Sequence, residues 1–336
     1  MAVVERGELH HRRTDRNRRR IVADAGARRV SKDAVVPALG PVDFNVREIQ
    51  PVALVGPPEL MARDWMSPYV WQDDGRLGIM VRAVPRADAE KTDTGVIWAG
   101  WSDDGQTFTM LPEPAIVPGP DPDQSGGVED PTVLKRDDGS YVVYYTGVAA
   151  DMAHGELFYA VGTAVDRLEK TGIALASSKS EGNTKEATVM RTVDGEWRLF
   201  YEYAEDQASR IGLALGRDIN GPWDEQPTPL RPRDDSWDNW HLSTGPILTD
   251  HPDWPVMFYN GATQDARWRI GWVVFDRACT RVVDRGIEPL IVPPPGTDRA
   301  ATDIAFAASA IVADGTIWLY YSLEDRKLAR ARIRRS

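Results

Sequence analysis

A tight turn followed by a run of aromatic and β-branched residues recurs five times along the chain. Four of these turns are Asp-Gly pairs and the fifth is a proline-bounded turn at 252–255. Their Gly or Pro positions are 75, 139, 195, 255 and 315, separated by 64, 56, 60 and 60 residues. Asp-Gly between two β-rich runs is a strong hairpin signal, because both central positions of a type I′ turn have positive φ. The pattern predicts a β-hairpin at each of the five places.

A second β-rich run follows most of these hairpins and ends in a short acidic turn. These runs begin at Val96, Phe158, Ile211 and Ile270, and the last one covers 328–333. They predict a third and a fourth strand in each repeat. Four antiparallel strands in about 60 residues, repeated five times, are typical of a β-propeller, whereas a sandwich would not show this period. We expect an all-β, five-bladed β-propeller with four-stranded antiparallel blades at 41–336, preceded by an N-terminal arm at 1–40.

The composition is that of a chain able to bury a core, with 42% hydrophobic and 27% charged residues among 336. No apolar run approaches the roughly 20 residues that span a bilayer, and the N-terminus has no signal-peptide core. We therefore expect no membrane contact and a cytoplasmic location. The single cysteine, Cys279, excludes an internal disulfide framework and a Cys-based metal cluster. The 12 tryptophans are compatible with sugar recognition and with core packing alike.

The net charge of −11 is unevenly distributed. Residues 1–40 contain ten Arg or Lys and five Asp or Glu, a local charge of +5, so the remainder carries −16. Such an acidic body repels phosphate backbones, and nucleic acid is not an expected partner. The basic arm is instead expected to pack across the acidic body or to mediate homo-oligomer formation.

A propeller places the innermost strand of each blade beside a central channel, where polar residues of successive repeats can converge. Several such residues stand in otherwise apolar strand sequences, in which an unpaired charge would be costly. The candidates are Ser67 and Arg82 in the first repeat, Glu129 and Asp130 in the second, Lys185, Glu186 and Glu202 in the third, His241 and Asn260 in the fourth, and Asp303 and Asp325 in the fifth. Any one of them could merely cap or solubilise a turn, but the recurrence in five repeats favours a common site.

Five sequence blocks, each at the start of its own repeat, carry a family likeness. They are MSP at 66–68, GVEDP at 127–131, NTKEA at 183–187, GPI at 245–247 and YYSLED at 320–325. In this order they resemble glycoside hydrolase family 130, whose members are five-bladed propellers that act on β-mannosides as phosphorylases or as hydrolases.

The resemblance implies that Asp130 is the general acid, which protonates the glycosidic oxygen indirectly through a sugar hydroxyl. A nearby negative charge such as Glu129 can keep a proton on that carboxyl group near neutral pH. Phosphorylases of this family hold inorganic phosphate with Arg, Lys and His side chains, and this chain has Glu202, His241 and Asn260 at those positions. Because a carboxylate repels phosphate, the resemblance implies hydrolysis, with Glu202 as the base that activates a water molecule.

We therefore predict an inverting glycosidase that acts on a β-mannoside or a related oligosaccharide and uses neither a cofactor nor a metal. Glu186 is the alternative base, and Tyr203 and the segment 237–240 are candidates for stacking on a pyranose ring. Three alternatives stay open: a phosphorylase of the same family, a glycosidase for arabinosides or other sugars, and a catalytically inactive carbohydrate-binding propeller. Ser67 and Thr132 favour the last one, because the family usually carries other residues there.

Overall fold

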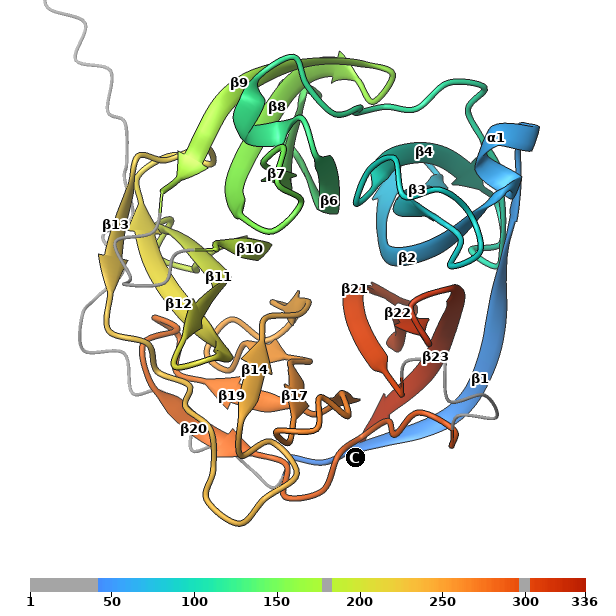
Figure 1. Cartoon of the computed structure of the whole chain (residues 1–336). Coiled ribbons are helices and arrows are strands. Elements are labelled where there is room, and N and C mark those ends of the chain that lie inside the picture. The colour runs from blue at the N-terminus through green and yellow to red at the C-terminus, as the bar shows by residue number, and fades with distance from the viewer. Residues whose placement is uncertain (1–41, 177–182, 296–302) are drawn as a thin grey trace, which may run out of the picture. The chain divides into compact units, whose positions relative to one another are not determined.

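Five blades of antiparallel strands follow one another around a common axis (Figure 1). The computed structural model describes residues 42–176, 183–295 and 303–336, which all belong to one compact unit. The expectation of an all-β five-bladed propeller is confirmed. The basic arm predicted at 1–40 lies outside the described residues, so the division of the chain at that point stays a prediction.

The first three blades each contain four consecutive strands. From the innermost strand outward, blade one contains β2 (Arg63–Asp73), β3 (Arg76–Pro85), β4 (Val96–Ser102) and β5 (Thr107–Met110); blade two contains β6 (Gly127–Lys135), β7 (Tyr141–Val148), β8 (Gly155–Ala164) and β9 (Arg167–Leu175); blade three contains β10 (Lys185–Arg191), β11 (Trp197–Glu205), β12 (Ala208–Gly216) and β13 (Trp223–Gln226). Two single-turn helical segments, α1 (Pro58–Met61) and η1 (Pro122–Gln124), lie in the connections.

Blade four differs because its three inner strands are each interrupted. Its two short sheets contain β14 (His241–Ser243), β17 (Asn260–Ala262) and β18 (Arg269–Ile270), and β15 (Ile247–Leu248), β16 (Val256–Met257), β19 (Val273–Phe275) and β20 (Val282–Arg285). The innermost strand is broken between β14 and β15, where the sequence contains Gly245 and Pro246. Proline cannot donate a ladder hydrogen bond, and glycine weakens a strand, so the break follows from the local sequence.

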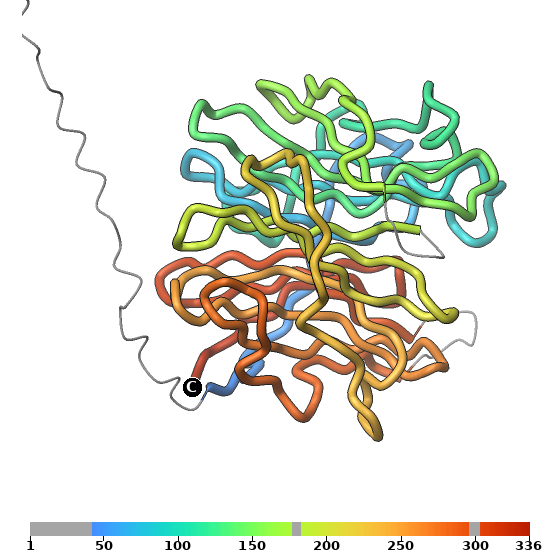
Figure 2. Tube along the Cα trace, turned by 90° about the vertical axis from the view of Figure 1, so that its left-hand side faces the viewer, coloured from blue at the N-terminus to red at the C-terminus, as the bar shows by residue number. Residues whose placement is uncertain are grey.

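Blade five is closed by a strand from the other end of the propeller. Its own strands are β21 (Ala305–Ala313), β22 (Thr316–Leu323) and β23 (Lys327–Arg335), and its outermost strand is β1 (Phe44–Val55). β1 pairs antiparallel with β23 and then parallel with β5 of blade one. Figure 2 shows the start of β1 beside the C-terminus, where Ser336 and Asp43 exchange backbone hydrogen bonds. The sequence predicts the fourth strand of the last blade within its own repeat, whereas in the structure β1 takes that place.

The five predicted hairpins are all present, although their turns are not all of one type. At Asp74-Gly75 and Asp314-Gly315 both residues have positive φ, as a type I′ turn requires. At positions 139 and 195 only the glycine has positive φ, with values of 83° and 87°. These two turns are one residue wider, and the glycine alone adopts the left-handed conformation.

Most of the aromatic residues fill the blades and the spaces between them. Tyr144, Tyr201 and Tyr320 are fully buried, and Trp71 packs edge-on against Trp101 with ring centroids 5.5 Å apart. Cys279 is buried as a free thiol. Within the described residues, no helix is long and apolar enough to cross a membrane, and no three or more His, Cys, Asp or Glu side chains are grouped to hold a metal ion.

Candidate active site

The innermost strands of blades one, two and three are irregular at the same point. The pairing register shifts after Met66 in β2, after Glu129 in β6 and after Lys185 in β10. Each irregularity contains one residue in the left-handed region: Ser67 at φ 50°, Asp130 at φ 51° and Glu186 at φ 41°. A non-glycine residue in this conformation costs about 1–3 kcal/mol and is typical of functional sites. A β-bulge redirects a side chain, and these three redirect theirs toward one another.

The carboxyl group of Asp130 is the meeting point of these side chains. The hydroxyl of Ser67 donates to Asp130 Oδ1 at 2.5 Å, and Glu186 is hydrogen bonded to Asp130 from the third blade. Arg82 Nη1 lies 3.6 Å from the same oxygen of Asp130. Ser67 and Arg82 of blade one and Glu186 of blade three therefore fix the position of the Asp130 carboxyl group. Asp130 is 5% exposed.

Two cations compensate the charge of Glu129. Arg82 Nη2 donates to Glu129 Oε1 at 2.6 Å, and Lys185 Nζ lies 3.7 Å from Glu129 Oε2. Arg82 is held in turn by the backbone carbonyl of Thr94. Ion pairs with Arg82 and Lys185 therefore compensate the charge of Glu129.

Glu186 is the residue that holds a proton in this cluster. Burial, followed by the charges of Asp130 and Glu202, raises the pKa of Glu186 well above its ordinary value. Two carboxyl groups in direct contact cannot both ionise readily, and the raised pKa of Glu186 places the proton of this contact on Glu186. This arrangement disfavours Glu186 as the alternative base, because a base must be unprotonated.

Glu202 lies on β11, apart from that pair. The Ser209 hydroxyl donates to Glu202 Oε1 at 2.9 Å. Burial raises the pKa of Glu202, as does the charge of Asp130, while the Ser243 hydrogen bond, the charge of Lys185 and the Ser209 hydrogen bond oppose the rise. Glu202 therefore ionises less readily than an ordinary glutamate but has donors that stabilise its charged form.

His241 and Asp325 border the same group of residues. The backbone N–H of Ser209 donates to His241 Nδ1 at 3.1 Å, so the ring proton of the neutral histidine is on Nε2. Burial and the charge of Arg210 lower the pKa of His241. Asp325, in the hairpin between β22 and β23, has its pKa raised by burial and by Asp130, with Arg82 acting in the opposite direction.

Asn260, predicted as a substrate contact, instead joins two blades. It is fully buried, and its side-chain N–H groups donate to the carbonyls of Thr244 at 3.0 Å and Ala307 at 3.1 Å. Its side-chain oxygen accepts the N–H of Ala307 at 2.6 Å. With its amide engaged in this way, Asn260 ties blade four to blade five.

Other predicted contacts also lie outside the cluster. Tyr203 is 6% exposed and packs in the interface between blades two and three, with its ring 6.0 Å from that of Tyr201. Trp237 stacks on Tyr259 at 5.7 Å and donates its indole N–H to the carbonyl of Ile287. Asp303 forms an ion pair with Arg267 at 2.6 Å. The side-chain directions of these residues depend on tertiary contacts that the sequence pattern does not reveal.

Ser209 is a site residue that sequence reasoning missed. It supplies a hydroxyl to Glu202 and a backbone N–H to His241, and so connects two predicted residues. It lies near the start of β12, directly after a surface turn, where serine is common for local reasons. No feature of the sequence around it indicates this role.

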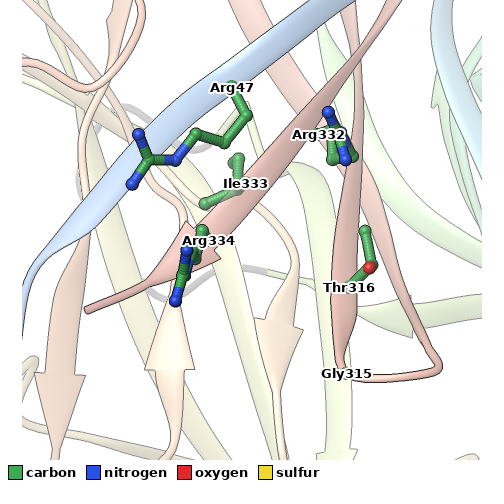
Figure 3. A pocket seen from close by; sticks show the side chains of 6 residues that line it. All are labelled: Arg47, Gly315, Thr316, Arg332, Ile333 and Arg334. Atoms are coloured by element: carbon green, nitrogen blue, oxygen red, sulfur yellow. The ribbon is translucent and has the colours of Figure 1, made fainter.

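A separate basic hollow of about 530 Å³ lies on the outer strands of blade five (Figure 3). It is lined by Arg47 of β1, by Arg332 and Arg334 of β23, and by the turn residues Gly315 and Thr316. None of the predicted site residues contributes to it. It is therefore distinct from the carboxylate cluster near the axis.

A five-bladed propeller whose inner strands bring together the carboxyl groups of Asp130, Glu186 and Glu202 has the kind of site that glycoside-active enzymes use. The family model described as beta-1,4-mannooligosaccharide phosphorylase matches residues 60–335. The chain thus belongs to glycoside hydrolase family 130, as its sequence blocks suggested.

Curated relatives and solved structures agree with this membership. The chain is 24% identical over 261 residues to a 1,2-beta-oligomannan phosphorylase of Thermoanaerobacter sp. (strain X514), a match that covers 75% of this chain and 84% of the relative. The Listeria innocua beta-1,2-mannobiose phosphorylase in complex with beta-1,2-mannobiose has a TM-score of 0.68 at 18% identity, covering 86% and 96% of the two chains. A third structure is described by the words "The GH130 family of mannoside phosphorylases contains glycoside hydrolases that target beta-1,2 mannosidic linkages in Candida mannan". It matches with a TM-score of 0.70 at 20% identity, over 89% of this chain and 95% of that one.

Proposed function

We propose that this protein hydrolyses β-mannosides with inversion of configuration, with Asp130 as general acid and Glu202 as general base. The observation that carries the proposal is the charge of the site. Five carboxyl groups are electrostatically linked there with two cations: Glu129, Asp130, Glu186, Glu202 and Asp325 with Arg82 and Lys185.

This balance disfavours phosphate as the nucleophile. Arg82 lies against Glu129 and Asp130, and Lys185 lies near Glu129 and Glu202, so both cations already compensate carboxylates. A phosphate dianion needs charge-assisted donors, and it would meet the carboxylate of Glu202. Water is neutral, so the carboxylate of Glu202 does not repel it. The phosphorylase names of the curated relatives make phosphorolysis the alternative, while the description of the third structure places hydrolases in the same family.

In the proposed reaction the two carboxyl groups act from different blades. Ionised Glu202 takes a proton from a water molecule as the water oxygen attacks the anomeric carbon. The bond to the leaving oxygen breaks, and that oxygen receives a proton from Asp130 through a sugar hydroxyl. Attack from the face opposite the departing group gives inversion. Glu186, which is hydrogen bonded to Asp130 and whose pKa is raised, has the role of holding a proton in the site near neutral pH.

Product analysis with β-1,2-mannobiose and other β-mannobioses tests the proposal. Mannose should form at the same rate with and without phosphate, and proton NMR should show the inverted anomer first. Asp130→Asn and Glu202→Gln should each lower kcat by about 10²–10⁴-fold, the usual contribution of general acid–base catalysis. The control Asp314→Asn, in a hairpin turn where Asn tolerates φ of 49°, should retain full activity. Phosphate-dependent formation of mannose 1-phosphate would refute hydrolysis and establish a phosphorylase.

A further inference from the structure

Three aromatic rings form a continuous row beside Glu202, on the blade-four and blade-five side of the site. The row starts at His241, whose ring centroid is 5.4 Å from that of Trp268. Trp268 in turn lies 5.2 Å from Phe306, edge to face. Since Ser209 bonds both Glu202 and His241, the row begins two hydrogen bonds away from the carboxylate.

These rings differ from the aromatic residues that fill the blades. The large tyrosines of the strands are fully buried, whereas His241, Trp268 and Phe306 are each partly exposed. Neither Trp268 nor Phe306 belongs to any of the five buried apolar clusters. The row is therefore not part of a hydrophobic core, and it presents apolar surface next to a polar site.

The strand connections hold the row in place. Trp268 forms a parallel bridge with Ile304, and the N–H of Ala305 donates to the Trp268 carbonyl at 3.2 Å. The neighbouring ion pair between Arg267 and Asp303 spans the same two segments at 2.6 Å. Asp303, predicted as a substrate contact, is better described as a positioning residue for this row. An arrangement fixed before binding loses little conformational entropy when a ligand arrives.

We propose that Trp268 and Phe306, with His241, form a binding platform for one neutral pyranose ring of the oligosaccharide substrate. This deepens the proposed function and rests on it for the identity of the ligand as a β-mannoside. A pyranose has an apolar C–H face and a polar rim, which match an aromatic surface with a hydrogen-bond donor at its edge. His241 provides that donor through Nε2–H, because its Nδ1 accepts the Ser209 N–H. Because Ser209 links His241 to Glu202, and Glu202 interacts electrostatically with Asp130, the sugar on the platform neighbours the ring that reacts.

Binding measurements on a catalytically silent background test the platform separately from the reaction. In Glu202→Gln protein, calorimetry with β-1,2-mannotriose should show a Kd about tenfold higher after Trp268→Ala, as expected for the loss of about 1.4 kcal/mol of stacking. Trp268→Phe should restore most of the affinity, because it keeps an aromatic face. The matched control Trp197→Ala removes a partly exposed tryptophan from the far end of β11 and should leave Kd unchanged.

The outcomes separate the platform from the proposed reaction. If Trp268→Ala folds, by circular dichroism, and binds mannotriose as tightly as its parent, the platform is wrong. If the parent binds no mannotriose, the assignment of the ligand as a mannoside is wrong. If the unmutated site releases mannose 1-phosphate while Trp268→Ala still weakens binding tenfold, hydrolysis fails and the platform stands. In the active enzyme Trp268→Ala should raise KM for mannotriose about tenfold with little change in kcat.

Discussion

Replacing Ser209 with alanine tests whether the ionisation of Glu202 controls turnover at low pH. The Ser209 hydroxyl donates to Glu202 Oε1 at 2.9 Å and so stabilises the charged form of the carboxylate. The backbone N–H that Ser209 gives to His241 is retained in alanine. The substitution therefore removes one interaction and leaves the rest of the site in place.

The size of the effect follows from the energy of one such hydrogen bond. A hydrogen bond to a charged group is worth about 1.5–3 kcal/mol, and we take the lower end because Glu202 is partly exposed and water can replace the hydroxyl. One pKa unit corresponds to about 1.4 kcal/mol. Losing a donor to the charged form raises the pKa further, so we expect the pKa of Glu202 to rise by about one unit. The base is then protonated at a higher pH, and the acidic limb of the pH–activity profile shifts to higher pH.

The assay is kcat/KM for a β-mannobiose as a function of pH, because this ratio reports ionisations of the free enzyme. The acidic limb of Ser209→Ala should shift by about one unit to higher pH, while the plateau at higher pH changes little. Ser140→Ala is the matched control, since it removes a serine hydroxyl that donates to Asp138 in a hairpin turn at 2.6 Å. An unshifted limb in folded Ser209→Ala, or a shift to lower pH, would refute the role of Glu202 as base.

Two further predictions concern the scaffold. Phe44→Ala removes a 4%-exposed ring that packs at 5.3 Å against both Phe258 and Trp272, and it should lower the free energy of unfolding by about 3–5 kcal/mol in urea titrations. An unchanged midpoint and slope would show that β1 is not needed to close blade five. Asp238→Ala leaves Arg233 and Arg285 without the buried carboxylate that they share, and it should lower the free energy of unfolding by about 3 kcal/mol. We take the lower end of the range for a broken buried pair because the Arg233 side chain is 26% exposed. Differential scanning calorimetry checks this, and a loss below about 1 kcal/mol would contradict the assignment of Asp238 as the centre of that network.

Much of the fold could be predicted because its signals are local. Asp-Gly turns and alternating β-rich runs report on neighbouring residues, so the five hairpins and the number of blades could be found in the sequence alone. The bulged residues Ser67, Asp130 and Glu186 could be singled out for the same reason, as polar side chains in apolar strands.

What the sequence by itself determined is the repeat and the set of polar residues near the axis; what the tertiary structure decided is how those residues are paired. The partner of β23 is β1, almost the whole chain away, and no local pattern specifies that match. The amide of Asn260 is directed to the backbone of blade five, and the charge of Glu129 is compensated by Arg82 and Lys185. The physical reason is that hydrogen bonds and ion pairs depend on distances of a few ångströms between segments far apart in sequence. Only the closed ring of blades sets those distances.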